Sequence, residues 1–225
     1  MIFSNKITHL IYDMDGVLLD TEPFYTQATQ EIVQKYGKNF DWSIKAQMLG
    51  RDSMDSARLL VKALDLPMAP EEYLAQREQK LEQLFPTAKP LPGAVALTEH
   101  FNKLGIRQAV ATSSYQSNFR LKTSLHQAWF SLFDCIITGD NAAVKRSKPA
   151  PDIFLAAAQT LQASPAQCLV FEDAPAGMEA ALAAGMFVVV IPDYHIDKAI
   201  FQRAHQILNS LAEFSPALWG LPPFD

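Results

Sequence analysis

Short apolar runs that alternate with longer helical segments are the feature that most limits the fold of this chain. The apolar runs are nearly continuous, as in strands that are buried on both faces of a sheet. A strand-helix alternation of this kind predicts a parallel sheet with helices on both sides. We therefore predict an α/β fold with a Rossmann-like parallel-sheet core. The runs lie at residues 9–15, 107–114, 134–140, 167–173 and 186–193.

Residues 21–88 have a different pattern, which predicts a second domain. Three segments, 22–37, 53–66 and 70–85, carry apolar residues at three- and four-residue spacing, which is typical of amphipathic helices. Ser53 and Pro70 are helix-start signals within this stretch. The block follows the first strand and ends near the proline-flanked "PTAKPLPG". We predict an all-helical cap domain over 21–88, inserted into a core domain formed by 1–20 and 89–225.

The charge and hydropathy patterns limit the possible partners. A net charge of −5 over 225 residues provides no basic face for a nucleic-acid backbone, so we expect no nucleic-acid partner. Asp13 interrupts the N-terminal apolar run early, and no later run reaches membrane-spanning length. We expect a cytoplasmic protein without a membrane partner. A monomer is the default for this architecture.

Polar residues gather where the predicted strands end. In open α/β sheets, ligands bind outside the carboxyl ends of the strands, so these residues should share one edge. Each group also has a simpler explanation: hydroxyl and acidic side chains cap helices, and loop lysines are usually solvated. Those explanations do not predict that all the groups share one edge. The residues are Asp13 and Asp15 after the first run, Thr112, Ser113 and Ser114 after the second, Lys148 after the third, and Glu172 and Asp173 after the fourth.

The chemistry of this set points to phosphoryl transfer. Four carboxylates in one crevice repel one another unless protons or a cation neutralise them. Oxygen ligands without histidine or cysteine favour Mg²⁺, which typically uses one or two carboxylates, water and a substrate phosphate. Thr112 or Ser113, together with Lys148, would supply hydrogen-bond donors and positive charge for phosphoryl oxygens.

Four motifs in order make the chain resemble the haloacid dehalogenase superfamily, in its subgroup with a helical cap after the first motif. They are "DMDGVLLDT", "ATS" at 111–113, "KPAPDIF" with Lys148, and "FEDAPAG" at 171–177. The resemblance covers essentially the whole chain. The stretches "LLDTEPFYT", "FDWSIKAQMLGR" and "WGLPPFD" are also similar to small-molecule phosphatases of eukaryotes, namely pseudouridine-5′-phosphatases and plant glycerol-3-phosphatase-like enzymes.

The resemblance implies a role for each motif residue. Asp13 would be the nucleophile that forms an aspartyl phosphate, and Asp15 would protonate the leaving oxygen and later activate water. Thr112, the Ser113 backbone and Lys148 would hold the phosphoryl oxygens. The Mg²⁺ ligands would be Asp13, the Asp15 carbonyl and Asp173, with Glu172 among or beside them.

The implied activity is hydrolysis of small phosphate monoesters. The substrate could be a nucleoside 5′-monophosphate such as pseudouridine 5′-phosphate, or a polyol or sugar phosphate. The cap would select it by closing over the core and excluding water. In "MLGRDS", Gly50 would permit close approach and Arg51 would reach a phosphate or hydroxyls. Alternatively, Gly50 only ends one helix and Asp52 or Ser53 starts the next.

Other activities in the same superfamily remain alternatives. A phosphomutase of the β-phosphoglucomutase type would share all four motifs, but such enzymes usually carry a histidine where this chain has Tyr25. A dehalogenase would not need the acid at Asp15. A non-catalytic phosphate-binding member would usually have lost Asp13, Asp15 or Lys148, and all three are present.

The C-terminal "SPALWGLPPFD" invites a separate prediction. We expect it to pack on the protein surface through Trp219 and Phe224, with a partner-binding tail as the alternative.

Overall fold

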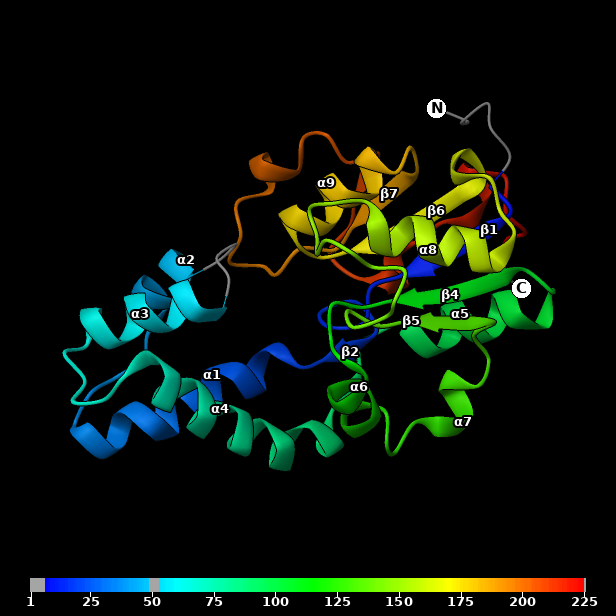
Figure 1. The fold of residues 1–225 in the computed structure, drawn as a ribbon. Helices are drawn as coiled ribbons and strands as arrows, with labels where there is room; N and C mark the ends of the chain where they lie inside the picture. Colours follow the sequence, from blue (N-terminus) through cyan, green and yellow to red (C-terminus); the bar gives the residue numbers. More distant parts are fainter. Residues whose placement is uncertain (1–6, 49–52, 225) are drawn as a thin grey trace. The chain divides into compact units, whose positions relative to one another are not determined.

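The computed structural model describes residues 7–48 and 53–224. These residues divide into two compact units. The core unit runs up to Asp20 and resumes at Lys89, and the cap unit is Thr21–Ala88. Figure 1 shows the sheet of the core unit and the helices of the cap unit. Gly50 and Arg51, to which the sequence assigned a substrate role, lie outside the described residues.

The core unit contains a six-stranded sheet in the order β5-β4-β1-β6-β7-β8, and every neighbouring pair is parallel. β1 is central, with Tyr12 paired to Val110 on one side and to Phe171 on the other. The predicted α/β fold is confirmed. The strands are β1 His9–Tyr12, β4 Arg107–Ala111, β5 Cys135–Ile137, β6 Cys168–Glu172, β7 Phe187–Val190 and β8 Gln206–Ile207.

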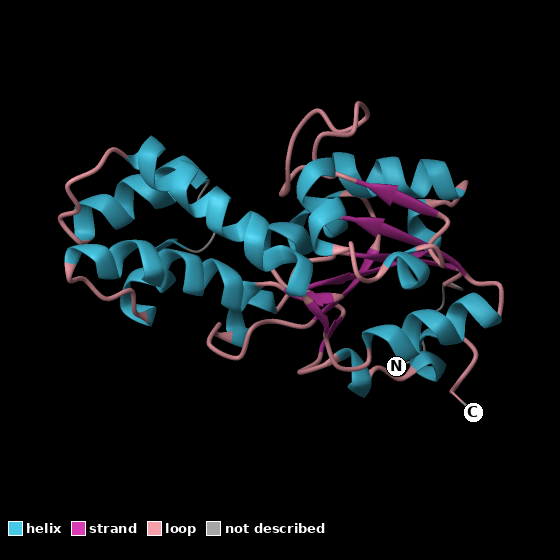
Figure 2. Cartoon of the chain, turned by 90° about the horizontal axis from the view of Figure 1, so that it is seen from below, coloured by secondary structure: helices cyan, strands magenta, loops and turns pink. Residues whose placement is uncertain are grey.

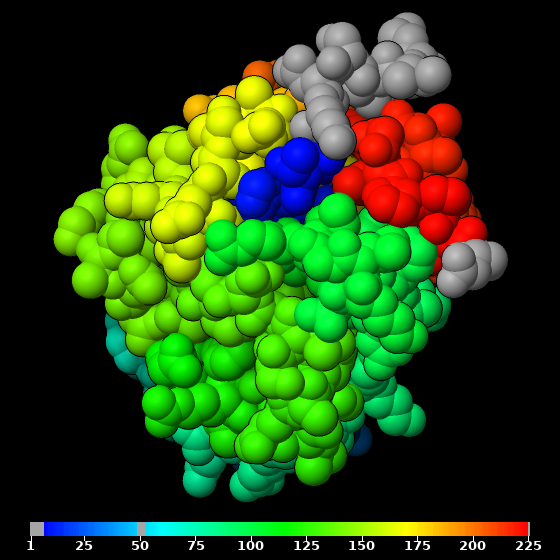
Figure 3. Space-filling model, turned by 90° about the vertical axis from the view of Figure 1, so that its right-hand side faces the viewer, coloured from blue at the N-terminus to red at the C-terminus, as the bar shows by residue number. Residues whose placement is uncertain are grey.

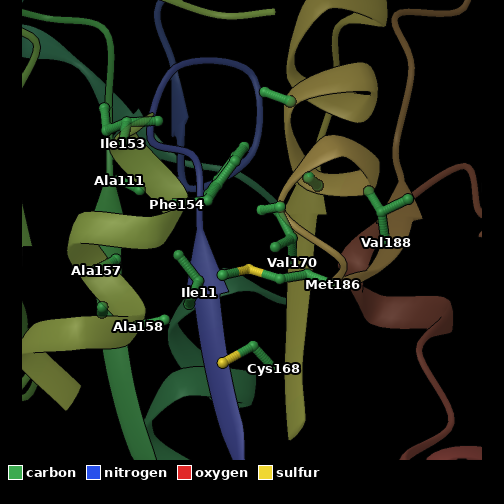
Figure 4. Packing of buried hydrophobic residues seen from close by; sticks show 14 of the residues in the cluster. Ile11, Ala111, Ile153, Phe154, Ala157, Ala158, Cys168, Val170, Met186 and Val188 are labelled. Atoms are coloured by element: carbon green, nitrogen blue, oxygen red, sulfur yellow. The ribbon is translucent and has the colours of Figure 1, made fainter. Parts of the chain in front are cut away.

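Helices cover both faces of this sheet, which explains the continuous apolar strands. α8 and α9 lie on one face and α5 on the other (Figures 1 and 2). Phe154 of α8 packs in one buried cluster with Ile11 and Val170 of the strands (Figure 4). Burying each such side chain contributes roughly 1.5–3 kcal/mol. The core helices are α5 Ala94–Lys103, α6 Gln116–Lys122, α7 Gln127–Phe130, α8 Asp152–Leu161 and α9 Pro175–Ala183. Short 3₁₀ helices span Pro165–Gln167, Lys198–Phe201, Leu211–Glu213 and Pro216–Trp219.

A two-stranded antiparallel ribbon marks where the chain leaves and re-enters the core unit. Its strands are β2 Leu19–Asp20 and β3 Lys89–Pro90. The loop from β1 to β2 turns tightly, because the N–H groups of Leu18 and Leu19 both donate to the Met14 carbonyl. Gly16 in this loop has a φ of 77°, a conformation that glycine adopts without strain. The loop therefore holds the acidic residues after β1 in a fixed turn.

The cap unit is helical, and its described residues form no strand. The helix starts predicted at Ser53 and Pro70 are observed. α2 was not predicted as a separate helix, because its apolar residues alternate with polar ones at a spacing of two instead of three or four. The elements are α1 Glu22–Val33, α2 Trp42–Met48, α3 Ser53–Ala63 and α4 Pro70–Leu84, with 3₁₀ turns at Gln34–Tyr36 and Phe85–Thr87.

The C-terminal segment packs on the core unit, as predicted. The Trp219 side chain is 1% exposed, and its Nε1–H donates to Oε1 of Gln206 at 2.9 Å. The Phe224 ring lies 4.7 Å from the His100 ring. Figure 3 shows this segment, in red, on the same face as the start of the described chain, in blue. Within the described residues, we find no helix of the length and hydropathy needed to cross a membrane.

Candidate active site

Asp13 occupies the carboxyl end of the central strand. Its backbone N–H donates to the Phe171 carbonyl at 2.9 Å, so the residue continues the β1–β6 ladder by one position. Asp13 is 6% exposed, and the next residue, Met14, is fully buried in the protein. Asp15 is partly exposed. The alternation of the chain thus directs Met14 inward, between two carboxyl groups that reach the sheet edge.

Lys148 joins the acids from two strands. Its Nζ donates to Oδ1 of Asp13 at 2.5 Å and to Oε1 of Glu172 at 2.6 Å. The same ammonium lies 3.3 Å from the Ala111 carbonyl and 4.9 Å from the centre of the Phe154 ring. Its side chain is only 8% exposed, so the simpler explanation of a solvated loop lysine does not hold. The structure thus brings Asp13, Lys148 and Glu172 into direct contact.

The electrostatics of this cluster favour added positive charge. Burial raises the pKa of Asp13 to about 7; Lys148 opposes this rise, and the nearby charges of Glu172 and Asp15 add to it. Burial also disfavours the charged form of Lys148, but Asp13 and Glu172 outweigh it and keep the pKa of this lysine above its ordinary value. Asp13 therefore takes up a proton more readily than an ordinary aspartate, while Lys148 stays charged.

Glu172 and Asp173 serve different neighbours. Oε2 of Glu172 accepts from the N–H groups of Asp173 and Ala174, while its other oxygen faces Lys148. Neither acid provides a side-chain cap for α9, whose N-cap is Ala174. Asp173 lies against the loop after β1, because a Cβ added to Gly16 would overlap its carboxylate. The Asp173 carboxylate, after β6, therefore lies against the loop that carries Asp15 after β1.

Thr112 and Ser113 follow β4 at the same edge. Thr112 is fully buried, and its Oγ1 accepts from the Ser114 N–H at 3.0 Å, whereas Ser113 is exposed. These residues do not cap α6, whose N-cap is Tyr115 without a side-chain bond. Asp140 accepts from the Gln116 N–H instead, at 3.1 Å. The Thr112 and Ser113 side chains therefore do not serve as caps of α6.

Asp15 has one partner that sequence reasoning missed, Lys122, and one that it placed at the same edge, Ser114. Nζ of Lys122 donates to Oδ1 of Asp15 at 2.6 Å, and Oγ of Ser114 donates to Oδ2 at 2.9 Å. A lysine in a short polar helix is ordinarily solvated. The one available signal is its position three residues after Phe119, which puts it on the same helical face as an aromatic side chain.

The acidic residues fit a cation that needs few protein ligands. Among the described residues, no group of three or more His, Cys, Asp or Glu side chains is arranged to hold a metal ion by itself. Mg²⁺ does not need such a cage, because it keeps several waters and binds one or two carboxylates plus substrate phosphate. Asp13 and Glu172 share the single Lys148 ammonium, and the Asp173 carboxylate lies against the loop after β1. The donor set therefore fits Mg²⁺.

The cap unit has a cavity of its own, of about 210 Å³, with both apolar and polar lining residues. The Arg77 guanidinium lies 5.9 Å from the Tyr25 ring and 5.8 Å from the Tyr73 ring. Its Nε is buried and makes no hydrogen bond within the described part of the chain. Lys45 also lines the cavity and bonds Thr26 and Glu22. The lining residues are Tyr25, Thr26, Thr29, Phe40, Lys45, Met48, Ser53, Ser56 and Arg77.

Comparisons with known proteins agree with the motifs. The family model for haloacid dehalogenase-like hydrolases matches residues 7–185. The chain is 45% identical to (DL)-glycerol-3-phosphatase 1, mitochondrial, of Arabidopsis thaliana, over 97% of this chain and 75% of that protein. It is 43% identical to a probable pseudouridine-5′-phosphatase of Drosophila melanogaster, over 97% and 96% of the two chains. A crystal structure of a putative β-phosphoglucomutase from Thermotoga maritima aligns with a TM-score of 0.78 at 27% identity, covering 95% and 97%.

Proposed function

Because the chain belongs to the haloacid dehalogenase-like hydrolase family, we propose that it is a Mg²⁺-dependent phosphatase of small organic phosphate monoesters. The observation that carries this proposal is the Asp13–Lys148–Glu172 cluster at the carboxyl end of the central strands. It combines a carboxylate nucleophile with a fixed positive charge. Two relatives that are more than 40% identical are named as phosphatases, which supports the same activity.

In the first step, Asp13 attacks phosphorus. Lys148 contacts Oδ1 of Asp13, so we assign the attack to the second carboxylate oxygen, Oδ2. The new bond joins Oδ2 to phosphorus, the ester P–O bond breaks, and Asp15 gives its proton to the leaving oxygen. Lys148, Thr112 and the Ser113 backbone bind the phosphoryl oxygens as charge develops on them.

In the second step, water hydrolyses the aspartyl phosphate. Asp15, now deprotonated, takes a proton from the water as its oxygen bonds to phosphorus. The bond between phosphorus and Asp13 breaks, which returns the carboxylate and releases inorganic phosphate. Asp15 therefore acts as acid in one step and as base in the next.

Asp13, the Asp15 carbonyl and Asp173 are the residues that we assign to Mg²⁺. The ion would neutralise negative charge on the carboxylates and on the phosphoryl group. Both oxygens of Glu172 already accept bonds from Lys148 or from backbone N–H groups. We therefore assign Glu172 chiefly to holding Lys148, beside the metal ligands.

The substrates that we propose are nucleoside 5′-monophosphates, such as pseudouridine 5′-phosphate, and polyol or sugar phosphates. The names of the two relatives represent both classes. The cap unit would take part in choosing among them, and its cavity offers the Arg77 and Lys45 cations together with hydroxyl groups. Such a lining suits a ligand that carries several hydroxyls or a second anionic group.

The test is phosphate release from a panel of esters with Mg²⁺ and with EDTA. The panel contains pseudouridine 5′-monophosphate, glycerol 3-phosphate, common hexose phosphates and β-glucose 1-phosphate. We expect release that requires Mg²⁺. Isomerisation of β-glucose 1-phosphate without net release would instead establish a mutase, and Mg²⁺ binding without any turnover would establish a non-catalytic member.

A further inference from the structure

A buried lysine that is not among the proposed phosphate-binding residues lies beside Asp15. Lys122 is the last residue of α6, and its side chain is 0% exposed, whereas that of Asp15 is 24% exposed. Lysine is almost never fully buried unless an opposite charge pairs with it. The burial of Lys122 therefore requires a partner as specific as the Asp15 carboxylate.

The contacts form a closed triangle. Lys122 Nζ lies 2.6 Å from Oδ1 of Asp15 and 2.9 Å from Oγ of Ser114. The Ser114 hydroxyl accepts from the lysine and donates to Oδ2 of Asp15 at 2.9 Å. Each carboxylate oxygen of Asp15 thus has its own donor, and the two donors also bond to each other. This arrangement fixes the plane of the carboxyl group as well as its position.

The fold holds both donors in place. The Gly139 N–H donates to the Ser114 carbonyl at 3.0 Å, and a Cβ at Gly139 would overlap the Ser113 carbonyl. Asp140 accepts from the Gln116 N–H and so anchors the first turn of α6. Because α6 is only seven residues long, anchoring its start also constrains Lys122 at its end.

We propose that Lys122, with Ser114, is a positioning residue that orients the Asp15 carboxyl group for proton transfer to the leaving oxygen. This inference rests on the proposed function, in which Asp15 is the general acid. Proton transfer in the transition state needs a donor within hydrogen-bond reach and in the right direction. A misplacement of about 1 Å can cost roughly a hundredfold in rate.

The choice of leaving group separates this role from a merely structural one. An alkyl phosphate expels an alkoxide, which needs the proton from Asp15 as the P–O bond breaks. p-Nitrophenyl phosphate expels a stable phenolate, which needs no proton. Because kcat/KM reports only the steps through the first irreversible one, it isolates phosphoryl transfer to Asp13 from the later hydrolysis.

The experiment compares kcat/KM for p-nitrophenyl phosphate and for the alkyl monoester of the panel that is turned over fastest. The variants are Lys122→Met, Ser114→Ala and Asp15→Asn, and the control is Lys103→Met, an exposed lysine at the end of α5. For Lys122→Met we expect a loss of about 10- to 100-fold on the alkyl ester and about threefold or less on the aryl ester. Asp15→Asn should also lose kcat/KM mainly on the alkyl ester, and the loss should be larger, roughly 10²- to 10⁴-fold. Ser114→Ala should lose less kcat/KM than Lys122→Met on the alkyl ester and little on the aryl ester. Lys103→Met should leave kcat/KM unchanged for both esters.

Three results would overturn the proposal. In the first two, Lys122→Met and Ser114→Ala lose kcat/KM equally on both esters, or on neither, while Asp15→Asn loses it mainly on the alkyl ester. The lysine then does not position Asp15, and the proposed function stands. If Asp15→Asn is itself unselective, its role as general acid fails and the inference fails with it. If Lys122→Met does not fold, the selectivity of Ser114→Ala decides the matter alone.

Discussion

The two units of this molecule treat their charged residues in opposite ways. In the core unit, Lys148 and Lys122 are nearly or fully buried, and each is held within 2.6 Å of a carboxylate oxygen at the sheet edge. In the cap unit, Lys45 and Glu22 form a 3.2 Å pair that is partly exposed, and the buried Nε of Arg77 has no hydrogen-bond partner within the described residues.

Under the proposed function, this difference matches two tasks. Proton and phosphoryl transfer require groups that are already in place, and buried, reciprocal contacts hold the core residues that we propose for them. Selection among ligands requires polar groups that line a cavity, and the cap cavity is lined by Arg77 and Lys45. Changes in the core should therefore affect chemistry or stability severely, and changes in the cap should affect selectivity or have small effects.

The largest contrast should come from removing the nucleophile. Asp13→Asn should lower kcat by at least about 10⁴-fold on every ester in the panel, because no other group replaces a lost nucleophile. Arg77→Met in the cap should leave p-nitrophenyl phosphate turnover within about threefold and change the order of preference among the panel esters. Steady-state kinetics on both variants checks this. An Arg77→Met variant as inactive as Asp13→Asn would break the comparison.

Replacing a lysine should destabilise the fold far more in the core unit than in the cap unit. Lys148→Ala leaves two buried carboxylates without their cation, and should reduce the free energy of unfolding by about 3–5 kcal/mol. Lys45→Ala removes a partly exposed pair and should cost no more than about 1 kcal/mol. Urea unfolding in EDTA gives both values. Adding Mg²⁺ should recover part of the Lys148→Ala loss and none of the Lys45→Ala loss.

A pair of glycine substitutions sharpens the comparison further. A Cβ at Gly177 of α9 would overlap the Glu172 carboxylate, so Gly177→Ala should lower kcat/KM by roughly 10- to 100-fold. Gly37 in the cap has a φ of 69° and no atom within 4 Å of an added Cβ. Gly37→Ala should cost about 1–2 kcal/mol of stability through backbone strain, with kcat/KM unchanged. Equal effects on activity would contradict the assignment of Glu172.

The smallest effects should come from two aspartates that anchor helix starts. Hydrogen bonds from Thr138 and from the Gln116 backbone lower the pKa of Asp140 in the core, and bonds from Ser43 and its neighbour lower that of Asp41 in the cap. A lowered folded-state pKa stabilises the fold fully above the ordinary aspartate range, and the stabilisation is lost as the pH falls through that lowered pKa. Asp140→Ala and Asp41→Ala should therefore be slightly destabilised at pH 7 and less destabilised at pH 3.

Activity distinguishes the two aspartates. Asp140 anchors the helix that carries Lys122, so Asp140→Ala should also lose kcat/KM on alkyl esters, whereas Asp41→Ala should not. Unfolding curves at the two pH values and kinetics at pH 7 test both statements. A pH-independent stability difference would show that the charge of these residues plays no part.

The sequence predicted the sheet because its strands are buried on both faces and so read as continuous apolar runs. It also indicated that Asp13, Lys148 and Glu172 would share an edge, since the carboxyl ends of parallel strands meet there. The two-residue strand β8 is too short to produce a pattern. The apolar residues of α2 recur at every second position, which is not a helical pattern.

Lys122 could not be predicted for a different reason. The role that we propose for it depends on the tertiary contact between α6 and the loop after β1, which local periodicity does not encode. The cap cavity is likewise formed by side chains from separate helices, and its shape depends on packing. Substrate choice therefore cannot be deduced from motifs, whereas the type of chemistry can.

Trapping the aspartyl phosphate is the most direct test of whether Asp13 carries the phosphoryl group. The enzyme is mixed with Mg²⁺ and the fastest ester of the panel, quenched in acid during turnover and reduced with borohydride, which converts an acyl phosphate of aspartate to homoserine. We predict homoserine at position 13 by peptide mass spectrometry, and none in unreacted enzyme. Rapid phosphate release with unmodified Asp13, or with homoserine at another aspartate, would contradict the account.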